Sequence, residues 1–210
     1  MNGLATLRRR SRGLGKRATL AGMAMALSLG CAAVVADSAR SGKMLSYTCA
    51  GCHGTNGVSN GSATPTIAGM DRFYLEKAMM TFADNTRAST VMGRIARGYT
   101  HAEIRAISAF FADQSWSAAT AKTDPDKVAA GAKLHQSFCI GCHGDRGTAN
   151  RADVPRLAGQ WPDYLFARLQ SIRAGTTGLP NAATMAMQTM IGNFSDAQLQ
   201  ALAHYYASQK

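Results

Sequence analysis

Two short cysteine motifs constrain most strongly how this chain of 210 residues can fold. They are Cys49-Ala50-Gly51-Cys52-His53 and Cys139-Ile140-Gly141-Cys142-His143, and each has the C-x-x-C-H pattern to which haem is attached covalently. Cysteines three residues apart lie on adjacent turns of one helical segment, so both sulfurs can form thioethers with one porphyrin. The histidine that follows points its imidazole at the iron from the same side. We therefore predict two covalent haem c groups, attached at Cys49, Cys52, Cys139 and Cys142, with His53 and His143 as iron ligands.

Other uses of paired cysteines fit the sequence less well. A disulfide scaffold in an exported protein could use four cysteines, but it would not need a histidine after each pair. A zinc site could use two Cys-x-x-Cys pairs, but it would leave two histidines spare and would need pairs offset by 90 residues. A thioredoxin-like site needs one such pair among βαβ elements, and the sequence lacks that strand pattern. A structural or metal-binding module is the remaining alternative, and the absence of a haem absorption band would favour it.

The sequence also repeats itself. A shift of 90 residues superposes the two motifs, and it carries Pro65, Ala68 and Gly69 onto Pro155, Ala158 and Gly159. After Tyr74-Leu75, which matches Tyr164-Leu165, the shift becomes 95, so that Phe110-Phe111 meets Tyr205-Tyr206. The second copy therefore has five extra residues, near positions 175 to 184. This pattern predicts two homologous tandem domains.

Helical signals dominate both copies, and convincing strand alternation is absent. Capping boxes, in which a Ser or Thr precedes a Glu or Gln by three residues, predict the start of each last helix at Thr100 and Ser195. Asp124 followed by Pro125 predicts another helix start. Further helices are expected from Asp71 to Ala83 and from Pro162 to Ala174. The predicted fold class is all-α, and each small domain needs its buried haem as part of the apolar core. The predicted divisions are a signal peptide at 1–36, domain 1 at 37–115, a linker at 116–124 and domain 2 at 125–210.

The second axial ligand of each iron is predicted from the repeat. Met92 and Met187 each lie eight residues before the cap of the last helix in their copy. Methionine as sixth ligand gives an electron-transfer haem of raised potential, whereas an empty site gives ligand binding or peroxidase chemistry. Met185 is an alternative to Met187, because it is close by and the preceding loop differs in length.

The remaining histidines, His101, His135 and His204, do not recur between the copies, so surface or structural roles are expected for them.

The first 36 residues have the pattern of a secretory signal peptide. Basic residues up to Arg17 precede an apolar run, and small residues end it at Ala36. Cleavage would give an exported, periplasmic protein with no stable membrane span. Lipidation at Cys31 is disfavoured, because Ser28 occupies the position where a lipoprotein signal usually has leucine.

The net charge of +11 comes partly from six basic residues in this leader, which has no acidic residue. The rest of the chain has 17 basic and 12 acidic residues, or +5. No nucleic-acid motif is present, and no nucleic-acid partner is expected.

The chain resembles a known family. Its two-domain layout is similar to cytochrome c4, and it resembles most closely the dihaem cytochrome subunit of flavocytochrome c sulfide dehydrogenase. The resemblance rests on Cys49–Gly57, Asp71–Glu76, Ser89–Tyr99, Gly131–His135, Leu157–Trp161 and Tyr206–Gln209. It implies two class I cytochrome c domains. It also implies that the carbonyls of Pro65 and Pro155 accept the N–H of the proximal imidazoles, although a simple turn would explain both prolines as well.

The same resemblance implies a function. An FAD flavoprotein partner would oxidise sulfide, and this chain would pass the electrons to a soluble cytochrome c or another redox acceptor. The chain has no G-x-G-x-x-G dinucleotide motif, so it is expected to be a non-catalytic subunit. The alternatives are a free cytochrome c4-like shuttle to a terminal oxidase and a dihaem peroxidase. The paired methionines argue against the peroxidase, which requires an open iron.

Overall fold

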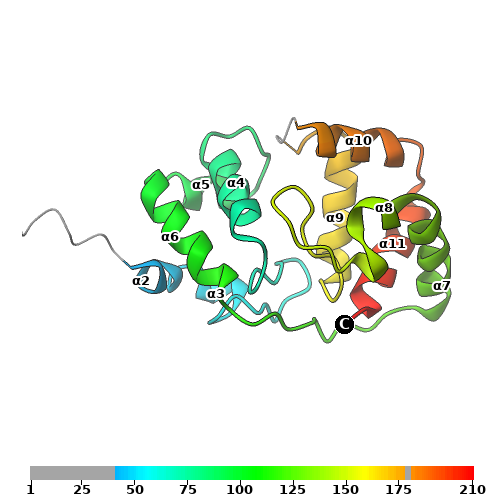
Figure 1. Cartoon of the computed structure of the whole chain (residues 1–210), viewed down its shortest axis with the longest axis horizontal. Helices are drawn as coiled ribbons and strands as arrows, with labels where there is room; N and C mark the ends of the chain where they lie inside the picture. The colour runs from blue at the N-terminus through cyan, green and yellow to red at the C-terminus, as the bar shows by residue number, and fades with distance from the viewer. Residues whose placement is uncertain (1–40, 178–180) are drawn as a thin grey trace, which may run out of the picture. The chain divides into compact units, whose positions relative to one another are not determined.

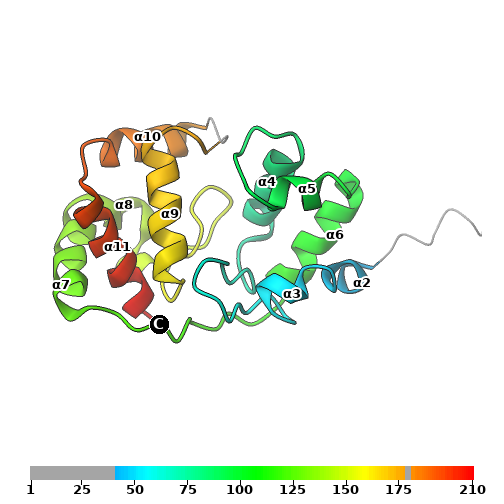
Figure 2. The same ribbon diagram turned by 180° about the vertical axis from the view of Figure 1, so that it is seen from behind.

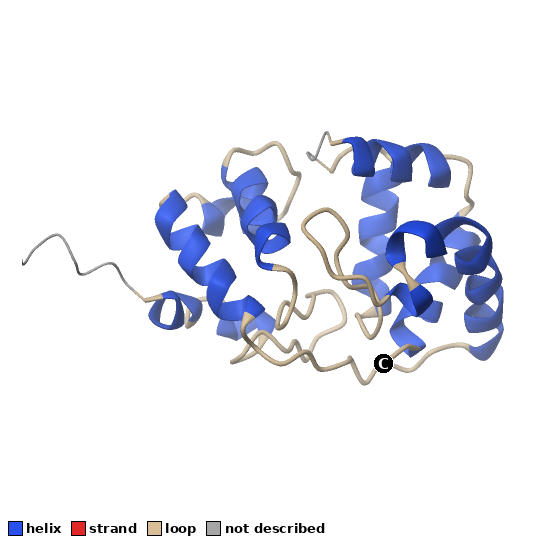
Figure 3. Cartoon of the chain, in the orientation of Figure 1, coloured by secondary structure: helices blue, strands red, loops and turns tan. Residues whose placement is uncertain are grey.

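A computed structural model describes residues 41–177 and 181–210, so the predicted signal peptide and Cys31 lie outside the described residues. The described chain consists of helices joined by loops (Figure 3). Within these two ranges, extended structure is limited to an isolated bridge between Arg151 and Val154. The predicted all-α class is therefore confirmed. None of the helices in these ranges has the length and apolar character needed to cross a bilayer.

The helices form two successive sets (Figure 1). The first set, here called the first repeat, contains α2 (Gly42–Ser46), α3 (Ala50–His53), α4 (Arg72–Ala83), α5 (Met92–Ala96) and α6 (His101–Ala112). The second repeat contains α7 (Pro125–Leu134), the π-helical turn η1 (His135–Cys139), α8 (Ile140–His143), the 3-10 turn η2 (Asp145–Gly147), α9 (Pro162–Arg173), α10 (Ala182–Ile191) and α11 (Asp196–Ser208). The segment between α6 and α7 has no helix.

The predicted helix starts are present in the structure. The hydroxyls of Thr100 and Ser195 each accept a hydrogen bond from the backbone N–H three residues on, at 3.3 Å, and the Glu103 and Gln198 side chains complete both capping boxes. Asp124 caps α7, which begins at Pro125. The helices expected from Asp71 and from Pro162 are observed as α4, which Asp71 caps, and α9. The structure adds α5 and α10 as helices around Met92 and Met187, where no helix was predicted.

Each repeat has its own hydrophobic cluster. The cluster of the first repeat consists of Leu45, Met70, Leu75, Ile107 and Phe111. The cluster of the second repeat consists of Leu165, Leu169, Ile172, Ile191, Leu199, Leu202, Ala203, Tyr205 and Tyr206. In both, the last helix supplies the most deeply buried side chains, such as Phe111 and Leu202. The last helix is therefore the central packing element of each repeat.

The first and last helices of each repeat cross at a glycine (Figure 2). A Cβ atom on Gly42 would lie 2.1 Å from the carbonyl oxygen of Ala106 in α6. A Cβ atom on Gly131 would likewise lie 2.1 Å from the carbonyl oxygen of Ala201 in α11. Since real Cβ atoms do not approach an oxygen so closely, only glycine permits these crossings. They fix where the cysteine motif that follows each first helix lies against the last helix.

The two repeats are joined by hydrogen bonds of a buried glutamine. Gln160 accepts a bond from the backbone N–H of Thr66 and donates one to its carbonyl, both at 2.9 Å. Both residues are almost fully buried. The indole N–H of Trp161 donates to the carbonyl of Ser59 at 3.2 Å. In the 90-residue register, Gln160 takes the position of Met70, so the contact depends on a residue that the two repeats do not share.

The glycine crossing of the second repeat leads to a stability prediction. Gly131→Ala should lower the free energy of unfolding of the haem-loaded protein by about 2 kcal/mol, because overpacking a tight site costs 1–3 kcal/mol. The added methyl would meet Ala201 and Tyr205. Urea unfolding followed by circular dichroism measures the change. Gly61→Ala is the matched control, since a Cβ there meets nothing within 4 Å. Equal midpoints for the two variants would contradict the prediction.

Candidate haem sites

The first motif forms a single helical turn that brings its histidine inward. The backbone N–H of His53 donates to the carbonyl of Cys49 at 2.9 Å, and the His53 ring is only 8% exposed. Its Nδ1 lies 2.8 Å from the carbonyl oxygen of Pro65, as the family resemblance implied. A carbonyl only accepts, so Nδ1 carries the proton and Nε2 keeps its lone pair for a metal. Burial lowers the pKa of His53, with the Pro65 carbonyl acting in the opposite sense, and this keeps the ring neutral.

The residue after each histidine must be glycine. Gly54 has φ of +80° and Gly144 has φ of +69°, a region that other residues rarely adopt. A Cβ on Gly54 would also lie 2.0 Å from the carbonyl oxygen of Val58. The positive φ turns the chain away from the helix axis directly after the histidine. This turn leads in the first repeat to the loop that carries Pro65.

The second motif differs from the first at its histidine. The Nδ1 atom of His143 is buried and has no hydrogen-bond partner among the described residues, so the expected bond to the Pro155 carbonyl is absent. The ring instead lies beside that of Tyr206, with centroids 6.4 Å apart. Burial, together with smaller effects of the neighbouring His135 and Arg151, lowers the pKa of His143 to about 4. The imidazole is therefore neutral at physiological pH, which is the form that binds iron.

A cavity in the second repeat collects the residues that the sequence predicted. Cys139, Cys142, His143 and Met187 all line it. The remaining wall is largely apolar and comes from α9, α10 and α11, including Leu165 and Leu202, from the loop at 152–160 that carries Pro155, and from residues of the first repeat such as Met70 and Tyr74. Met185 is 60% exposed and is not part of the wall, whereas Met190, which is 47% exposed, lies at its edge. Of the two predicted alternatives, Met187 is the one that shares the cavity with His143.

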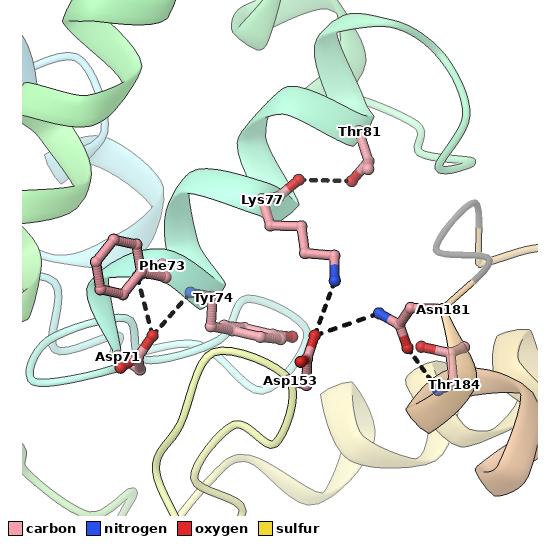
Figure 4. A network of polar contacts seen from close by, with 8 residues as sticks. All are labelled: Asp71, Phe73, Tyr74, Lys77, Thr81, Asp153, Asn181 and Thr184. Carbon is pink, nitrogen blue, oxygen red and sulfur yellow. Dashed lines mark hydrogen bonds and ion pairs between the residues drawn. The ribbon is translucent and has the colours of Figure 1, made fainter.

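The position of α10, which carries Met187, depends on contacts near its start (Figure 4). The Asn181 side chain caps the helix by accepting a bond from the Thr184 N–H at 2.8 Å. Its amide donates to Asp153 at 3.4 Å, and Asp153 also pairs with Lys77 of α4 at 2.8 Å. Asp153 therefore contacts both the start of α10 and the first repeat. The five-residue insertion expected near 175–184 falls in this region, and residues 178–180 of it lie outside the described residues.

Met92 occupies the equivalent place in the first repeat. It is the first residue of α5 and is half-buried. It does not belong to the hydrophobic cluster of that repeat or to the residues packed against it. The structure thus places Met92 at a helix start within reach of solvent.

A buried cluster of arginine and tyrosine lies beside the cavity, and it was not predicted from the sequence. Arg87 is 7% exposed and stacks on the Phe82 ring, with 4.3 Å from Cζ to the centroid. Burial lowers the pKa of Arg168, and its neighbour Arg87 lowers it further. Arg87 and Tyr164 also interact through a side-chain hydrogen bond. In the described part of the chain, neither guanidinium forms an ion pair with a carboxylate. Single arginines carry no motif, so only the fold reveals that they gather here.

These features fit covalent haem. The four motif cysteines are free thiols, placed one turn apart beside a neutral imidazole. Haem has an apolar ring that the cavity wall can cover. Its two carboxylates could pair with the buried guanidiniums, which have no carboxylate partner among the described residues. The described residues contain no cluster of three or more His, Cys, Asp or Glu side chains that could hold a metal ion by themselves. Two haem c groups, one for each motif, are the cofactors that this arrangement accommodates.

Comparison with known proteins leads to the same class. The model of the cytochrome c family matches residues 128–210. The cytochrome subunit of sulfide dehydrogenase from Chlorobaculum tepidum is 49% identical over 74 residues, which are 35% of this chain and 66% of that protein. The thiosulfate dehydrogenase electron acceptor of Thiomonas intermedia is 30% identical over 173 residues, covering 77% of this chain and 78% of that protein.

A solved structure extends the similarity to the fold. Reduced recombinant cytochrome c4 from Pseudomonas stutzeri superposes with a TM-score of 0.72 at 26% identity, over 80% of this chain and 97% of that one. The similarity thus spans both repeats and both cysteine motifs. Together with the free thiols and the neutral buried histidines, it shows that this chain belongs to the dihaem class I c-type cytochromes, which are electron-transfer proteins.

Proposed function

We propose that His53 and Met92 ligate the iron of the first haem, and that His143 and Met187 ligate the iron of the second. The Nδ1 bond of His53 to Pro65 leaves its Nε2 free for iron. In the second repeat, His143 and Met187 line the same cavity. Met92 is proposed because it takes the position of Met187 in the first repeat, eight residues before the cap of the last helix. The division into domains at 37–115 and 125–210, with a linker at 116–124, belongs to the same proposal.

In this arrangement the haem iron supplies the one-electron chemistry, and the protein supplies attachment, orientation and exclusion of water. The cysteines hold the cofactor covalently. The Pro65 carbonyl fixes the tautomer and direction of His53. The apolar walls contributed by α9 and α11 shield the second site.

The electron donor that we propose is a sulfide-oxidising flavoprotein. The observation that supports it is the 49% identity with the cytochrome subunit of sulfide dehydrogenase, although that match covers only 35% of this chain. The flavoprotein would carry the sulfide chemistry, since this chain has no dinucleotide-binding motif and its four motif cysteines are assigned to haem. Electrons would leave for a soluble acceptor such as a cytochrome c. The expected location is the periplasm, where c-type haems are assembled after export.

A free electron shuttle of the cytochrome c4 type is the second candidate. It is favoured by the similarity over most of the chain, which is to cytochrome c4 and to electron acceptors of thiosulfate dehydrogenase. Both candidates require two six-coordinate haems, so spectra of the isolated protein do not separate them. They differ in whether a flavoprotein forms a stable complex with this chain.

The proposed methionine ligands lead to a test by substitution. Met92→Leu and Met187→Leu should each keep both haems attached, open one iron to carbon monoxide and lower the potential of that haem, because methionine ligation raises it. Leucine keeps the volume of the side chain, so packing changes little. Met185→Leu is the control and should bind no carbon monoxide. Carbon monoxide binding by the Met185 variant instead of the Met187 variant would transfer the ligand role to Met185.

The proposed partner leads to a test by purification. A tagged chain purified from its native cells should bring down a flavoprotein, detected by flavin fluorescence after acid release. Sulfide should then reduce the haems of the purified complex, which the absorption spectrum reports directly. Purified cytochrome alone, mixed with sulfide, is the control for direct chemical reduction. Recovery of the dihaem chain without flavin, together with reduction by a thiosulfate-oxidising fraction, would favour the free shuttle.

A further inference from the structure

The two helices that carry the proposed methionine ligands are held in place differently. In the first repeat, α5 lies against α4, and its Gly93 and Ala96 are buried. A Cβ atom on Gly93 would lie 3.3 Å from the carbonyl oxygen of Phe82 in α4. The Ser89 hydroxyl accepts a hydrogen bond from the Gly93 N–H at 2.8 Å. All of these contacts are made within the first repeat, so Met92 is positioned from inside its own repeat.

Helix α10 of the second repeat is anchored mainly at its end. Among its ten residues, which the structure describes in full, Ile191 at the end of the helix is the one that is buried. Met187 is partly buried and packs against the hydrophobic cluster of the second repeat. Apolar contacts of this kind do not reach the first turn of α10. The place where the helix begins is therefore set by polar contacts.

These polar contacts converge on Asp153 (Figure 4). Its Oδ1 atom accepts a hydrogen bond from the Asn181 amide at 3.4 Å and another from the Lys77 ammonium at 2.8 Å. Asn181 is the residue that caps α10, through the Thr184 N–H. Lys77 belongs to α4 of the first repeat. One carboxylate oxygen thus connects the first repeat to the cap of the helix that carries Met187.

The loop that carries Asp153 is itself fixed on the first repeat. The Asn150 side chain accepts a bond from the Asp71 N–H at 2.8 Å and donates one to the Gly69 carbonyl at 2.9 Å. Two backbone hydrogen bonds then close the turn at 151–154. Asp153 is therefore a fixed point against which the start of α10 is placed.

The two repeats cannot make this contact reciprocally. In the 90-residue register, Asp153 takes the position of Ala63, and Lys77 corresponds to Ala167. Two alanines thus stand where a reciprocal pair would need a carboxylate and an ammonium group. The Lys77 and Asp153 side chains are 39% and 54% exposed, and exposed ion pairs contribute little to stability. The pair is better explained by what it positions than by any stability that it adds.

We propose that Asp153 is a positioning residue for Met187. Through Asn181 it sets where α10 begins, and through Lys77 it makes that placement depend on the first repeat. Contacts behind a metal ligand fix its orientation and so tune its bond to the metal. The proposal rests on the proposed role of Met187 as an iron ligand. It predicts a dependence in one direction, because the Met92 helix has no matching contact with the second repeat at the equivalent alanines.

The ease with which imidazole displaces Met187 from the oxidised iron is the quantity that this role should change. Imidazole and methionine compete for one coordination position, so a methionine that is less well placed lets imidazole bind with higher apparent affinity. Asp153→Ala removes the acceptor of both contacts. We expect it to raise the imidazole affinity of the second iron about threefold, the scale of a partly exposed ion pair. The imidazole affinity of the first iron should not change.

The experiment is an imidazole titration of the oxidised, haem-loaded full chain, followed by absorption and by proton NMR. A methionine methyl group bound to haem iron gives a strongly shifted NMR signal, and the Met92→Leu and Met187→Leu variants assign the two signals. Lys77→Ala removes only the contact from the first repeat and should give part of the rise. Asn181→Ser keeps a helix cap but removes the amide that reaches Asp153, so it should raise the affinity as well.

Two control variants change the charge by the same amount outside these contacts. Arg72→Ala removes an exposed basic side chain from α4, the helix that carries Lys77. Asp126→Ala removes an exposed acidic side chain from α7. Both should leave the imidazole affinities of the two irons unchanged.

The double variant Lys77→Ala/Asp153→Ala tests whether Lys77 acts through Asp153. It should then match Asp153→Ala alone, because residues that share one contact do not have additive effects. Fully additive rises, imidazole affinities equal to that of the unsubstituted protein in all variants, or equal rises at both irons would overturn the proposal. If Asp153→Ala does not fold, Lys77→Ala and Asn181→Ser still decide the matter. Failure of the ligand assignment is distinguishable, because Met187→Leu would then leave every iron-bound methionine signal in place.

Discussion

The close crossing of the first and last helices is the contact on which both haem sites depend. At Gly42 and Gly131 the first helix lies directly against a backbone carbonyl of the last helix. The cysteine motif follows the first helix within a few residues, so this contact sets which side chains of the last helix lie under the motif histidine. In the second repeat Tyr206 lies beside His143, and Phe111 is its counterpart in the first repeat; both are nearly fully buried. A shift of the crossing by one residue would present a different face to the imidazole, because side chains turn by about 100° per residue along a helix.

Several buried groups are understandable only in the presence of a cofactor. Arg87 is almost fully buried, no carboxylate of the described ranges pairs with it, and Arg168 lies beside it. Removing charges from water without compensation is costly, so a polypeptide would not retain these groups unless a bound anion met them. The largely apolar cavity, which Arg168 also lines, has the same implication, since an apolar ring would fill it. The polypeptide thus contains chemical complements of both the apolar ring and the acidic edge of haem, on top of the cysteines that attach it.

The sequence predicted the features that depend on local patterns. The cysteine motifs, the capping boxes at Thr100 and Ser195 and the helix start at Pro125 each need only a few neighbouring residues, and the structure confirms the helix starts. The π-turn at His135 was not predictable, because the additional residue becomes visible only when Gly42 and Gly131 are aligned through their contacts with the last helix. For the same reason, the sequence could not predict that Gln160 pairs with Thr66 or that Arg87 lies beside Arg168. They depend on how two repeats pack, which no short pattern encodes.

The differences between the repeats are concentrated where two copies of one fold must acquire separate tasks. Met70 has become Gln160, and the glutamine supplies the buried bonds that join the repeats. Ser46 and Phe111 have become His135 and Tyr206, which bond to each other beside the second motif. The first change gives the second repeat a side chain that binds the backbone of the first, and the first repeat has no matching side chain at that position. The second gives two otherwise similar haem sites different polar surroundings. A duplicated scaffold with identical surroundings would offer two haems of equal reduction potential. Polar substitutions at a few buried positions can make two potentials differ, because in a low-dielectric interior each hydrogen bond acts on its neighbour with little screening.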